Sequence, residues 1–477
     1  MKSVKGTHFI QQEHPELLVD ESALSGGSCQ SAAWPENTTE ATEYMKECFE
    51  DRVPLTISGA RTGIAGGAVP IGGAVLSTDL LKGILPTSRE NIIRVQAGET
   101  LDSVQEYCKT EKPCLFYPPD PTETTASIGG TVATDASGAD SYKFGSTRKW
   151  IDRLKILLPS GTALTIKRGN YQFSSGKLRH PSLGLITLPK LEKPQPVKNA
   201  AGFHIAPNMD LIDLFIGSEG KLGLILEADL VLARKPYAIA SFAVFCNENQ
   251  FWKLRSDLIN ASLSLRELEA MADPSLSFLS RNTGKTFPGR GNWVLLTSID
   301  VASEEELDTA LEALEMLLEE HGISPDNTWG GFDEIERKRL KEFRHLLPET
   351  VNRVISGFSL KNSRIHKIST DTAVPPEQLM EYYETMRSVL ENSEVEHVVF
   401  GHSGQGHLHA NLIPNDNSQL EKAELAVEQI AAEAVKLGGT VSAEHGTGKL
   451  KVPLLRLMYS QKELDDMGLL EKSISSC

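Results

Sequence analysis

Ser58-Gly59-Ala60-Arg61-Thr62-Gly63-Ile64-Ala65-Gly66-Gly67 directly follows a β-like run at residues 53–58. Glycines in such a turn let backbone N–H groups approach and surround phosphate oxygens, because no side chain blocks them. The turn lacks the Gly-Lys-Ser/Thr ending of a Walker loop, and it does not follow the GxGxxG spacing. On its own it is therefore as typical of a plain hairpin loop as of a phosphate site.

Two further glycine-rich segments lie outward from this turn. The first of them begins with a rigid approach, Tyr117-Pro118-Pro119-Asp120-Pro121, because each proline fixes its own φ angle. It continues as Ser127-Ile128-Gly129-Gly130-Thr131-Val132-Ala133-Thr134-Asp135-Ala136-Ser137-Gly138. The other is Phe215-Ile216-Gly217-Ser218-Glu219-Gly220-Lys221-Leu222-Gly223.

These three segments, in this order and at these separations, resemble the vanillyl-alcohol-oxidase-type (PCMH-type) family of FAD-linked oxidoreductases. They are most similar to the branch that holds D-lactate dehydrogenases, the catalytic subunit of glycolate oxidase and D-2-hydroxyglutarate dehydrogenase. The resemblance runs from about residue 34 to residue 449. It implies that the first loop wraps the pyrophosphate of FAD, the second lines the ribityl chain and flavin ring, and the third closes the adenine side.

The resemblance also implies which residues contact the cofactor. These are Ser58, Gly59, Ala60, Arg61, Thr62, Gly63, Gly66, Gly67, Pro119, Asp120, Ile128, Gly129, Gly130, Thr131, Thr134, Ser137, Gly138, Glu219 and Ile225. Several relatives attach FAD covalently through a histidine of the first loop. Residues 58–67 contain neither histidine nor cysteine, so we expect FAD to be bound non-covalently.

The fold class that we predict is α+β, with a two-part PCMH-type FAD-binding domain and an α+β, ferredoxin-like substrate cap domain. Residues 1–235 form the first and 236–440 the second, and 441–477 return to the FAD domain. Strict alternation of apolar residues at 222–232 predicts a strand with one buried face, and residues 170–210 read as a loop. Capping boxes at Ser303/Glu306 and Ser418/Glu421 predict the starts of two helices. Members of the family usually end in an Asn-Pro-Gly-Lys-like tail, so the ending at Cys477 predicts a short C-terminal segment.

Composition excludes several classes of protein. The formal net charge of −16 argues against a nucleic-acid surface, which requires clustered lysine and arginine. Six scattered cysteines without a CxxC pair indicate a reduced chain without its own iron–sulfur cluster. No run reaches the roughly 18 apolar residues of a transmembrane helix, and the N-terminus lacks the apolar stretch of a signal peptide. The expected location is the cytoplasm.

Histidines are concentrated late in the chain, in Gly401-His402-Ser403-Gly404-Gln405-Gly406-His407-Leu408-His409-Ala410-Asn411 and in Ala443-Glu444-His445-Gly446. Glycines between the histidines permit a tight turn, which would let both ends converge. Two imidazoles and one carboxylate make up the ligand set of a divalent-metal site with an open position. The alternative is a set of structural histidines in the core or at the surface with their hydrogen bonds made, which is the usual explanation of a single histidine.

This pattern resembles the substrate-side signature of the same family. His402, His409 and Glu444 match its metal positions, His445 matches the proposed base, and Asn411 matches a position near the substrate. The metal implied is a divalent ion such as zinc, although not every relative holds one. The family usually reads Asp-Gly-Asn where this chain has Gln405-Gly406-His407, and His407 competes as a ligand because residues two apart on a strand share a face.

Two cations are candidates for binding a substrate carboxylate. The basic stretch 337–345 is typical of a solvated helix face, but Arg344 stands where the family places a substrate-binding arginine. A guanidinium suits that task because its planar fork engages both carboxylate oxygens. Lys367 matches a lysine of the family's substrate side. Pro348 occupies a position where some hydroxyglutarate enzymes carry threonine, which weakens the match to that substrate.

The function implied is FAD-dependent oxidation of a small 2-hydroxy acid to the 2-oxo acid. The electron acceptor is left open among an electron-transfer flavoprotein, a quinone and an iron–sulfur subunit. The oligomeric state is also open, with a homodimer as one option. Two alternatives keep the fold: a flavin-dependent transferase without net redox chemistry, and a non-catalytic flavin-binding subunit of a larger oxidase.

Overall fold

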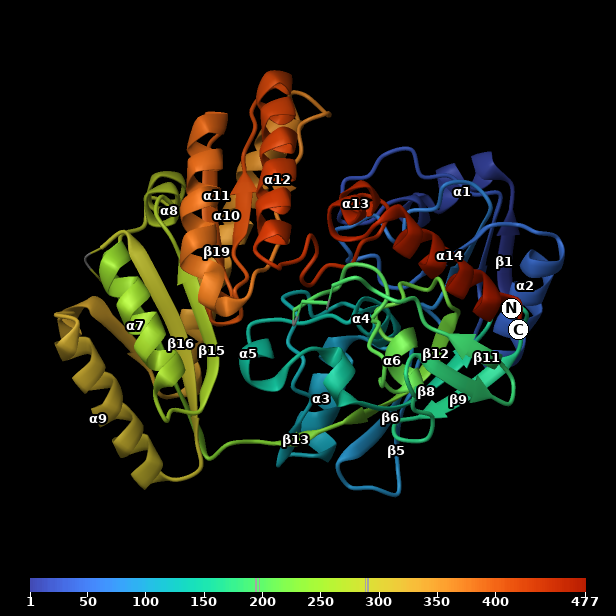
Figure 1. The fold of residues 1–477 in the computed structure, drawn as a ribbon, viewed down its shortest axis with the longest axis horizontal. Helices are drawn as coiled ribbons and strands as arrows, with labels where there is room; N and C mark the ends of the chain where they lie inside the picture. Colours follow the sequence, from blue (N-terminus) through green and yellow to red (C-terminus); the bar gives the residue numbers. More distant parts are fainter. Residues whose placement is uncertain (194, 197, 288, 290) are drawn as a thin grey trace.

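A computed structural model describes residues 1–193, 195, 196, 198–287, 289 and 291–477. Two parts of the chain lie side by side (Figure 1), and a linker after residue 234 joins the sheets of the first part to a separate sheet in the second. This arrangement of mixed helices and sheets confirms the predicted α+β class. In the described part of the chain, no helix combines the length and apolar character that crossing a membrane requires.

The first part contains two main sheets. One has the order β1-β2-β4-β3, and its strands are β1 (Lys2–Lys5), β2 (Ser31–Trp34), β4 (Ala74–Ser77) and β3 (Leu55–Ser58). The other has the order β5-β6-β12-β8-β9, with β5 (Ile84–Pro86), β6 (Ile92–Gln96), β12 (Leu224–Val231), β8 (Ile151–Leu157) and β9 (Ala163–Lys167). Strands β2, β3 and β4 pair in parallel, whereas the second sheet is antiparallel throughout.

Helices and short strands cover these sheets. The helices are α1 (Thr7–Glu13), α2 (Thr38–Glu50), α3 (Leu101–Glu111), α4 (Ile128–Thr134), α5 (Ser141–Phe144) and α6 (Leu211–Phe215). A short ladder joins β7 (Leu115–Phe116) to β13 (Ala233–Arg234). The region expected to be a loop contains a hairpin of β10 (Lys177–His180) and β11 (Gly184–Thr187), so that expectation was wrong there. The hairpin is mostly exposed, which explains why no apolar pattern marks it.

The alternating stretch forms a strand, but its burial differs from the prediction. Strand β12 is the central strand of its sheet and packs on α4. Six of its eight residues are buried, including neighbours such as Leu224 and Ile225 that point to opposite faces. The prediction of one buried face was therefore wrong, because both faces of this central strand are covered.

The second part is a seven-stranded sheet in the order β17-β14-β16-β15-β19-β20-β18, and all of its pairs are antiparallel. Its strands are β14 (Ala238–Cys246), β15 (Leu265–Met271), β16 (Trp293–Val301), β17 (Thr328–Gly331), β18 (Ile368–Ser369), β19 (His397–Gly401) and β20 (His409–Leu412). Helices α7 (Glu248–Asn260), α9 (Glu304–Glu320), α11 (Leu379–Ser393) and α12 (Asn417–Lys436) share an apolar core with one face. Helices α8 (Ser275–Thr283) and α10 (Glu334–Ser359) pack on the other.

The two predicted helix caps have different outcomes. The side chain of Ser303 accepts a hydrogen bond from the backbone of Glu306 at the start of α9, as predicted. Helix α12 instead begins after Asp416, whose carboxylate accepts from the backbone N–H of Gln419. The predicted cap at Ser418 was wrong by two residues, because Asp416 offers an equally good acceptor one position before the helix.

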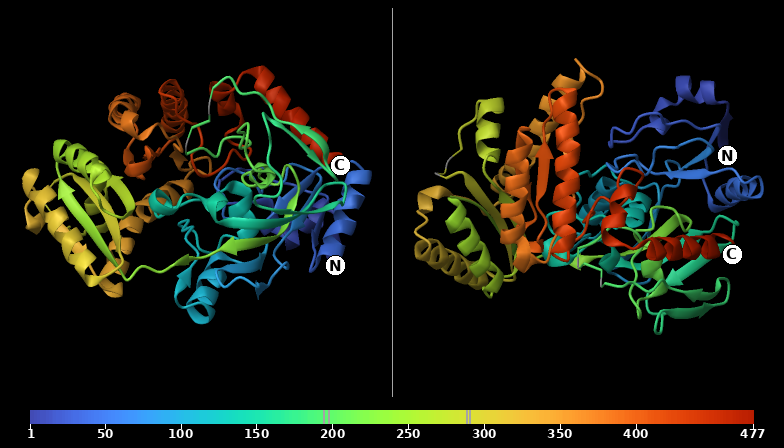
Figure 2. Two further views of the ribbon diagram at one scale, coloured as in Figure 1. Left: turned by 60° about the horizontal axis from the view of Figure 1, so that its bottom comes forward. Right: turned by 45° about the horizontal axis from the view of Figure 1, so that its top comes forward.

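The last residues run back over the first part (Figure 2). Helix α13 (Leu455–Met458) precedes α14 (Gln461–Ser475), which contacts β11. Met467, Leu470 and Ile474 on α14 belong to the apolar core that also contains β8 and β12. The chain therefore leaves the second sheet after α12 and passes between the two parts before it ends.

Candidate active site

The first two glycine loops touch directly. The Oγ of Ser127 caps α4 by accepting from the backbone N–H of Gly130 (3.3 Å), and it also accepts from Ala60 N–H (3.3 Å) in the first loop. A Cβ on Gly59 would lie 2.5 Å from that same oxygen. Because Gly59 has no side chain, the loop after β3 can approach the start of α4.

The third loop packs against the other end of α4. The backbone N–H of Glu219 donates to the carbonyl of Ala133 (2.7 Å), and that of Gly217 donates to Val132 (2.9 Å). All three glycine-rich segments therefore meet around one short helix.

The residues present fit a dinucleotide-type cofactor. Side chains added at Gly63 or Gly67 would meet no atom within 4 Å, so this turn leaves open space beside its backbone. Gly129 and Gly138 are packed tightly instead, with a Cβ at 2.7 Å from the Ala97 side chain and at 1.7 Å from the Asp120 carbonyl, respectively. The scaffold is thus closed where the loops touch each other and open at the first turn.

The remaining residues predicted to contact FAD lie on or next to these loops, and their contacts with the cofactor stay a prediction. Ser58 ends β3; Ala60, Arg61, Thr62 and Gly66 lie in the first loop; Pro119 and Asp120 precede α4; Ile128, Gly130, Thr131 and Thr134 are on α4; Ser137 follows it; Ile225 is on β12. Arg61 has a positive φ of 63°, and its guanidinium pairs with Asp79 (3.1 Å). Ile225 is 6% exposed and belongs to the core.

Three histidines converge at the turn between β19 and β20. The turn is possible because Gly401 and Gly406 take positive φ angles of 140° and 72°. The carbonyl of His402 accepts from the backbone N–H of His407 (3.2 Å), which closes the turn. His402, His407, His409 and Glu444 each offer one ligand atom, and these atoms lie within 4.8 Å of one another. The predicted convergence of His402 and His409 is present, and His407 lies with them.

Electrostatics keep most of these groups in the form that binds a cation. Burial lowers the pKa of His407 to about 4, with Lys198 adding to the effect. Burial and the neighbouring imidazole of His407 hold the pKa of His409 well below its usual value. Burial would raise the pKa of Glu444, but His402 and Lys198 outweigh it and hold that pKa well below normal. Metal ligation requires neutral imidazoles and an ionised carboxylate, and the shifts of His407, His409 and Glu444 favour these forms. The pKa of His402 moves the other way, because burial would lower it but Glu269 and Glu444 outweigh burial and raise it.

Glu444 lies on the segment between α12 and α13. This segment contacts all three glycine-rich loops. Its Oε1 accepts from Ser137 Oγ in the second loop (2.7 Å). Gly448 N–H donates to the Glu219 carboxylate in the third loop (2.6 Å). Lys449 Nζ donates to the carbonyl of Gly67 in the first (2.9 Å). The histidine cluster is therefore tied to the cofactor loops through residues 444–449.

His445 is partly exposed beside the cluster. Its Nδ1 lies 3.3 Å from Oδ2 of Asp371, and its ring stacks on that of His409 with centroids 5.6 Å apart. The Asp371 carboxylate also accepts from the backbone N–H groups of Glu444 (3.2 Å) and His445 (3.0 Å). A carboxylate at Nδ1 orients an imidazole so that Nε2 can accept a proton.

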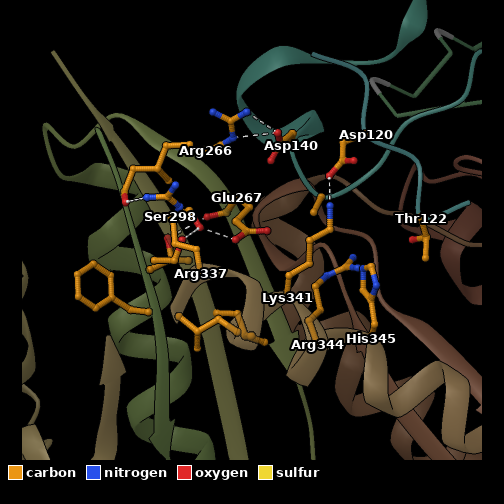
Figure 3. A pocket seen from close by; sticks show the side chains of 17 residues that line it. Asp120, Thr122, Asp140, Arg266, Glu267, Ser298, Arg337, Lys341, Arg344 and His345 are labelled. Atoms are coloured by element: carbon orange, nitrogen blue, oxygen red, sulfur yellow. Dashed lines mark hydrogen bonds and ion pairs between the residues drawn. The ribbon is translucent and has the colours of Figure 1, made fainter. Parts of the chain in front are cut away.

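Arg344 lies on α10 and borders a cavity between the two parts. Figure 3 shows this cavity, whose volume is about 190 Å³, with Arg344 and His345 on one side and Asp120 near Lys341. The guanidinium forms an ion pair through Nε with the buried carboxylate of Glu269. The other oxygen of Glu269 contacts Nδ1 of His402. Glu269 thus links the predicted clamp residue to the histidine cluster.

Lys367 and Asn411, the other two residues predicted to lie near the substrate, have different surroundings. Lys367 donates from Nζ to Oδ1 of Asn352 (3.1 Å), which lies about two turns beyond Arg344 along α10. Asn411 is buried on β20, in register with Ser369 of β18. Arg344 is thereby connected to the cluster through Glu269, whereas the contact of Lys367 is with α10.

Sequence reasoning missed three charged residues of this site. Glu269 lies on β15, Lys198 lies in the segment read as a loop, and Asp371 follows β18. Lys198 Nζ is 2.6 Å from Oε1 of Glu444 and donates to Gln405 (2.8 Å). Asp371 offered a signal, since an acidic residue stands among the apolar and hydroxyl residues at 368–374. Lys198 offered none.

Comparisons with known proteins identify the family. Residues 30–167 match the family described as "FAD binding domain", and residues 235–470 match "FAD linked oxidases, C-terminal domain". Together these matches place the chain in the FAD-linked oxidase family, with an FAD-binding domain in its first part. The resemblance found in the sequence is confirmed.

Several relatives match over nearly the whole chain. The glycolate oxidase subunit GlcD of Bacillus subtilis is 28% identical over 444 residues, which cover 92% of this chain and 84% of the relative. A D-lactate dehydrogenase of Anaerostipes hadrus is 29% identical and covers 91% of this chain and 86% of its own. A D-2-hydroxyglutarate dehydrogenase of Xanthomonas citri is 27% identical, with 91% and 84% covered.

Proposed function

We propose that this protein oxidises a small 2-hydroxy acid to the corresponding 2-oxo acid, with FAD as the electron acceptor. The observation that carries the proposal is the bond from Ser137 in the second cofactor loop to Glu444, directly next to His445. It sets a proton acceptor beside the loop expected to line the flavin. The names of the relatives, which include glycolate, D-lactate and D-2-hydroxyglutarate enzymes, support the same class of substrate.

The reaction removes two electrons and two protons from the substrate. FAD, when bound, would supply the two-electron acceptor for the hydride that leaves Cα of the hydroxy acid. His445 takes the hydroxyl proton, and Asp371 at its Nδ1 stabilises the imidazolium that results. General-base assistance of this kind contributes about 10²–10⁴-fold to a rate.

Arg344 and Lys367 bind the substrate carboxylate in this proposal. The ion pair of Arg344 with Glu269 runs through Nε. The two terminal nitrogens of the guanidinium make no hydrogen bond to the part of the chain that the structure describes, so they could bind an anion. Asn411 contributes a polar side chain on β20. Fixing the carboxylate orients Cα, and such positioning lowers the barrier by removing rotational freedom beforehand.

His402, His409 and Glu444 would hold a divalent cation such as zinc, which would polarise the substrate hydroxyl and lower its pKa. The donor set agrees with the preferences of zinc for imidazole and carboxylate. Electrons then pass to a separate acceptor, for which an electron-transfer flavoprotein, a quinone and an iron–sulfur subunit are the candidates.

The test is an anaerobic absorbance spectrum of the purified protein after addition of D-lactate, glycolate or D-2-hydroxyglutarate, with the L-enantiomers of the chiral acids as controls. We expect bleaching of the oxidised flavin band near ~450 nm with at least one D-acid or glycolate. Bound flavin that none of these acids reduces would refute the proposal. Acid precipitation should release the flavin into the supernatant, because residues 58–67 offer no histidine or cysteine for a covalent link.

A further inference from the structure

We propose that His407 is a fourth protein ligand, so that three imidazoles and one carboxylate enclose the cation instead of two imidazoles and one carboxylate. This inference rests on the cation site of the proposed function. It departs from the family pattern, which usually has asparagine at this position.

Three imidazoles converge on one oxygen of Glu444. Oε2 of Glu444 lies 3.2 Å from Nε2 of His402, 3.8 Å from Nδ1 of His407 and 3.9 Å from Nε2 of His409. In a tetrahedral zinc site with bonds of about 2.0–2.1 Å, neighbouring ligand atoms are about 3.3 Å apart. Nδ1 of His407 lies as close to this oxygen of Glu444 as Nε2 of His409 does. The family pattern already counts His409 as a ligand.

Each of the four groups also has an outer partner on its other polar atom. Nδ1 of His402 contacts Glu269, and Nδ1 of His409 faces the carbonyl of Thr370 (3.4 Å). Nε2 of His407 lies 3.3 Å from Asp371. Oε1 of Glu444 is engaged by Ser137 and Lys198. Outer acceptors of this kind orient metal-binding imidazoles through the nitrogen that does not bind the metal. His407 uses its nitrogens the other way round from His402 and His409, with Nδ1 toward Glu444 and Nε2 near Asp371 in an ion-pair contact without hydrogen-bond geometry.

Burial of His407 calls for a partner at Nδ1. Its side chain is 0% exposed, and neither ring nitrogen makes a hydrogen bond to any part of the chain that the structure describes. A buried polar atom without a partner is costly. A cation at Nδ1 would satisfy that nitrogen, and Asp371 would align with Nε2–H on the opposite side of the ring.

The fourth ligand changes what the site can do. Four protein groups fill the tetrahedral shell that zinc prefers in closed sites. The substrate hydroxyl would then enter as a fifth ligand, and the cation would be held more tightly than by three ligands.

The experiment compares the zinc-loaded full-length protein with His407→Asn, the residue usual in the family, and with His180→Asn, another buried histidine on β10. Zinc K-edge X-ray absorption counts the imidazoles, and titration against a chelator gives the zinc affinity. We expect three imidazoles in the parent protein. His407→Asn should retain two and lose about 100-fold or more in affinity, beyond what outer partners alone contribute, while His180→Asn should match the parent.

Each other outcome is informative. Two imidazoles in the parent, or unchanged affinity in His407→Asn, would overturn the fourth ligand. No bound zinc would also overturn it, and flavin bleaching by a hydroxy acid in that protein would show that the proposed oxidation stands independently. Three imidazoles without any bleaching would instead refute the oxidation and keep the ligand. If His407→Asn fails to fold, the imidazole count of the parent decides the question.

Discussion

Asp371 contacts several groups of the site at once. Its buried carboxylate faces His407 and His445, accepts from two backbone N–H groups of the 444–445 segment, and pairs with Lys451. Burial would raise the pKa of Asp371, but His445 and Lys451 outweigh it and keep the pKa well below normal. The residue is therefore an anion that positions both the histidine cluster and the proposed base.

His445→Ala should leave FAD bound but slow flavin reduction by the substrate by about 10²–10⁴-fold, the usual contribution of a general base. The reason is that the imidazole of His445 lies next to Asp371 and is 28% exposed, whereas the three imidazoles of the cluster are 12% exposed or less. Stopped-flow bleaching under anaerobic conditions measures the rate, and released flavin measures the cofactor content. His366→Ala, outside the cluster, is the control. Equal reduction rates in His445→Ala and the parent would disprove the assignment.

Glu267 predicts a pH dependence of stability. Burial raises the pKa of this carboxyl from its ordinary value of 4.5 to about 7, and Glu269 and Asp140 add to the effect while Ser298 and Arg344 oppose it. Because the pKa of Glu267 is raised in the folded state, its protonation stabilises the fold. This contribution to the free energy of unfolding is fully present below pH 4.5 and is lost as the pH rises through 7. Glu267→Gln keeps an acceptor for the Ser298 hydroxyl (2.5 Å) and should gain on the order of 1–3 kcal/mol over the parent across this window.

Denaturation midpoints in urea at about pH 5 and about pH 8 check the sign. The parent should lose stability relative to Glu267→Gln as the pH rises. A constant difference between the two proteins would show that Glu267 is ionised throughout.

The histidines of the site could be predicted because a short glycine-spaced motif contains them. Glu269 could not, since its contact with His402 joins residues 133 apart in the chain and nothing local marks it. Arg344 was predicted to bind the substrate carboxylate, yet its ion pair with Glu269 depends on how β15 and α10 pack. Such partners follow from tertiary packing and not from spacing.

Among the elements, α4 requires a glycine at position 129, where it packs closely on the end of the neighbouring strand. Gly129 N–H donates to the carbonyl of Ala97 (2.8 Å), the residue directly after β6, and an added Cβ would lie 2.7 Å from the Ala97 side chain. Gly129→Ala should therefore push α4 away from the sheet and cost about 1–3 kcal/mol, with weaker FAD binding. Gly357→Ala is the matched control inside α10, where an added Cβ meets nothing within 4 Å.

That control should move in the opposite direction. Alanine in an exposed helix interior is about 0.5–1 kcal/mol more favourable than glycine, so Gly357→Ala should raise the thermal midpoint while Gly129→Ala lowers it. Thermal unfolding followed by circular dichroism and by flavin fluorescence measures both effects. A loss in both variants, or in neither, would contradict the close approach of α4 to β6.

Elements with strong apolar periodicity, such as α9 and β12, were predicted from sequence, because periodicity reports which faces are buried. The hairpin of β10 and β11 was missed because most of its residues are exposed. The burial of β12 on both faces was missed because its intervening residues include Asp229, which is buried only through ion pairs with Arg94 (2.7 Å) and Arg153 (3.0 Å). Alternation alone cannot distinguish a solvated charge from a paired one.

At the scale of the whole molecule, the two parts are joined by polar contacts around the site. Arg266 on β15 reaches across to Asp140 (2.7 Å) in the first part and also pairs with Asp300 (3.1 Å). Its guanidinium lies 5.0 Å from the ring centroids of both Phe116 and Phe144. Lys341 on α10 makes a second, more exposed bridge to Asp120 (3.2 Å). These two bridges between the same parts differ chiefly in burial.

Arg266→Met and Lys341→Met therefore form a matched pair. The Arg266 side chain is 11% exposed against 55% for Lys341. Removing Arg266 leaves Asp140 buried without its counter-charge, and loss of one partner of a buried pair costs about 3–5 kcal/mol. Removing Lys341 should cost less than about 1 kcal/mol, because an exposed pair is solvated and screened. We expect Arg266→Met to unfold at a lower temperature and to release FAD before the second sheet melts, since the first part loses its ion pair with β15.

Thermal unfolding at low and high salt, monitored by flavin fluorescence and circular dichroism, separates the two variants. The loss of stability in Lys341→Met should vanish in high salt, and the loss in Arg266→Met should persist. Equal, salt-sensitive losses in both variants would mean that Arg266 is solvated and that the two parts are held together by other contacts.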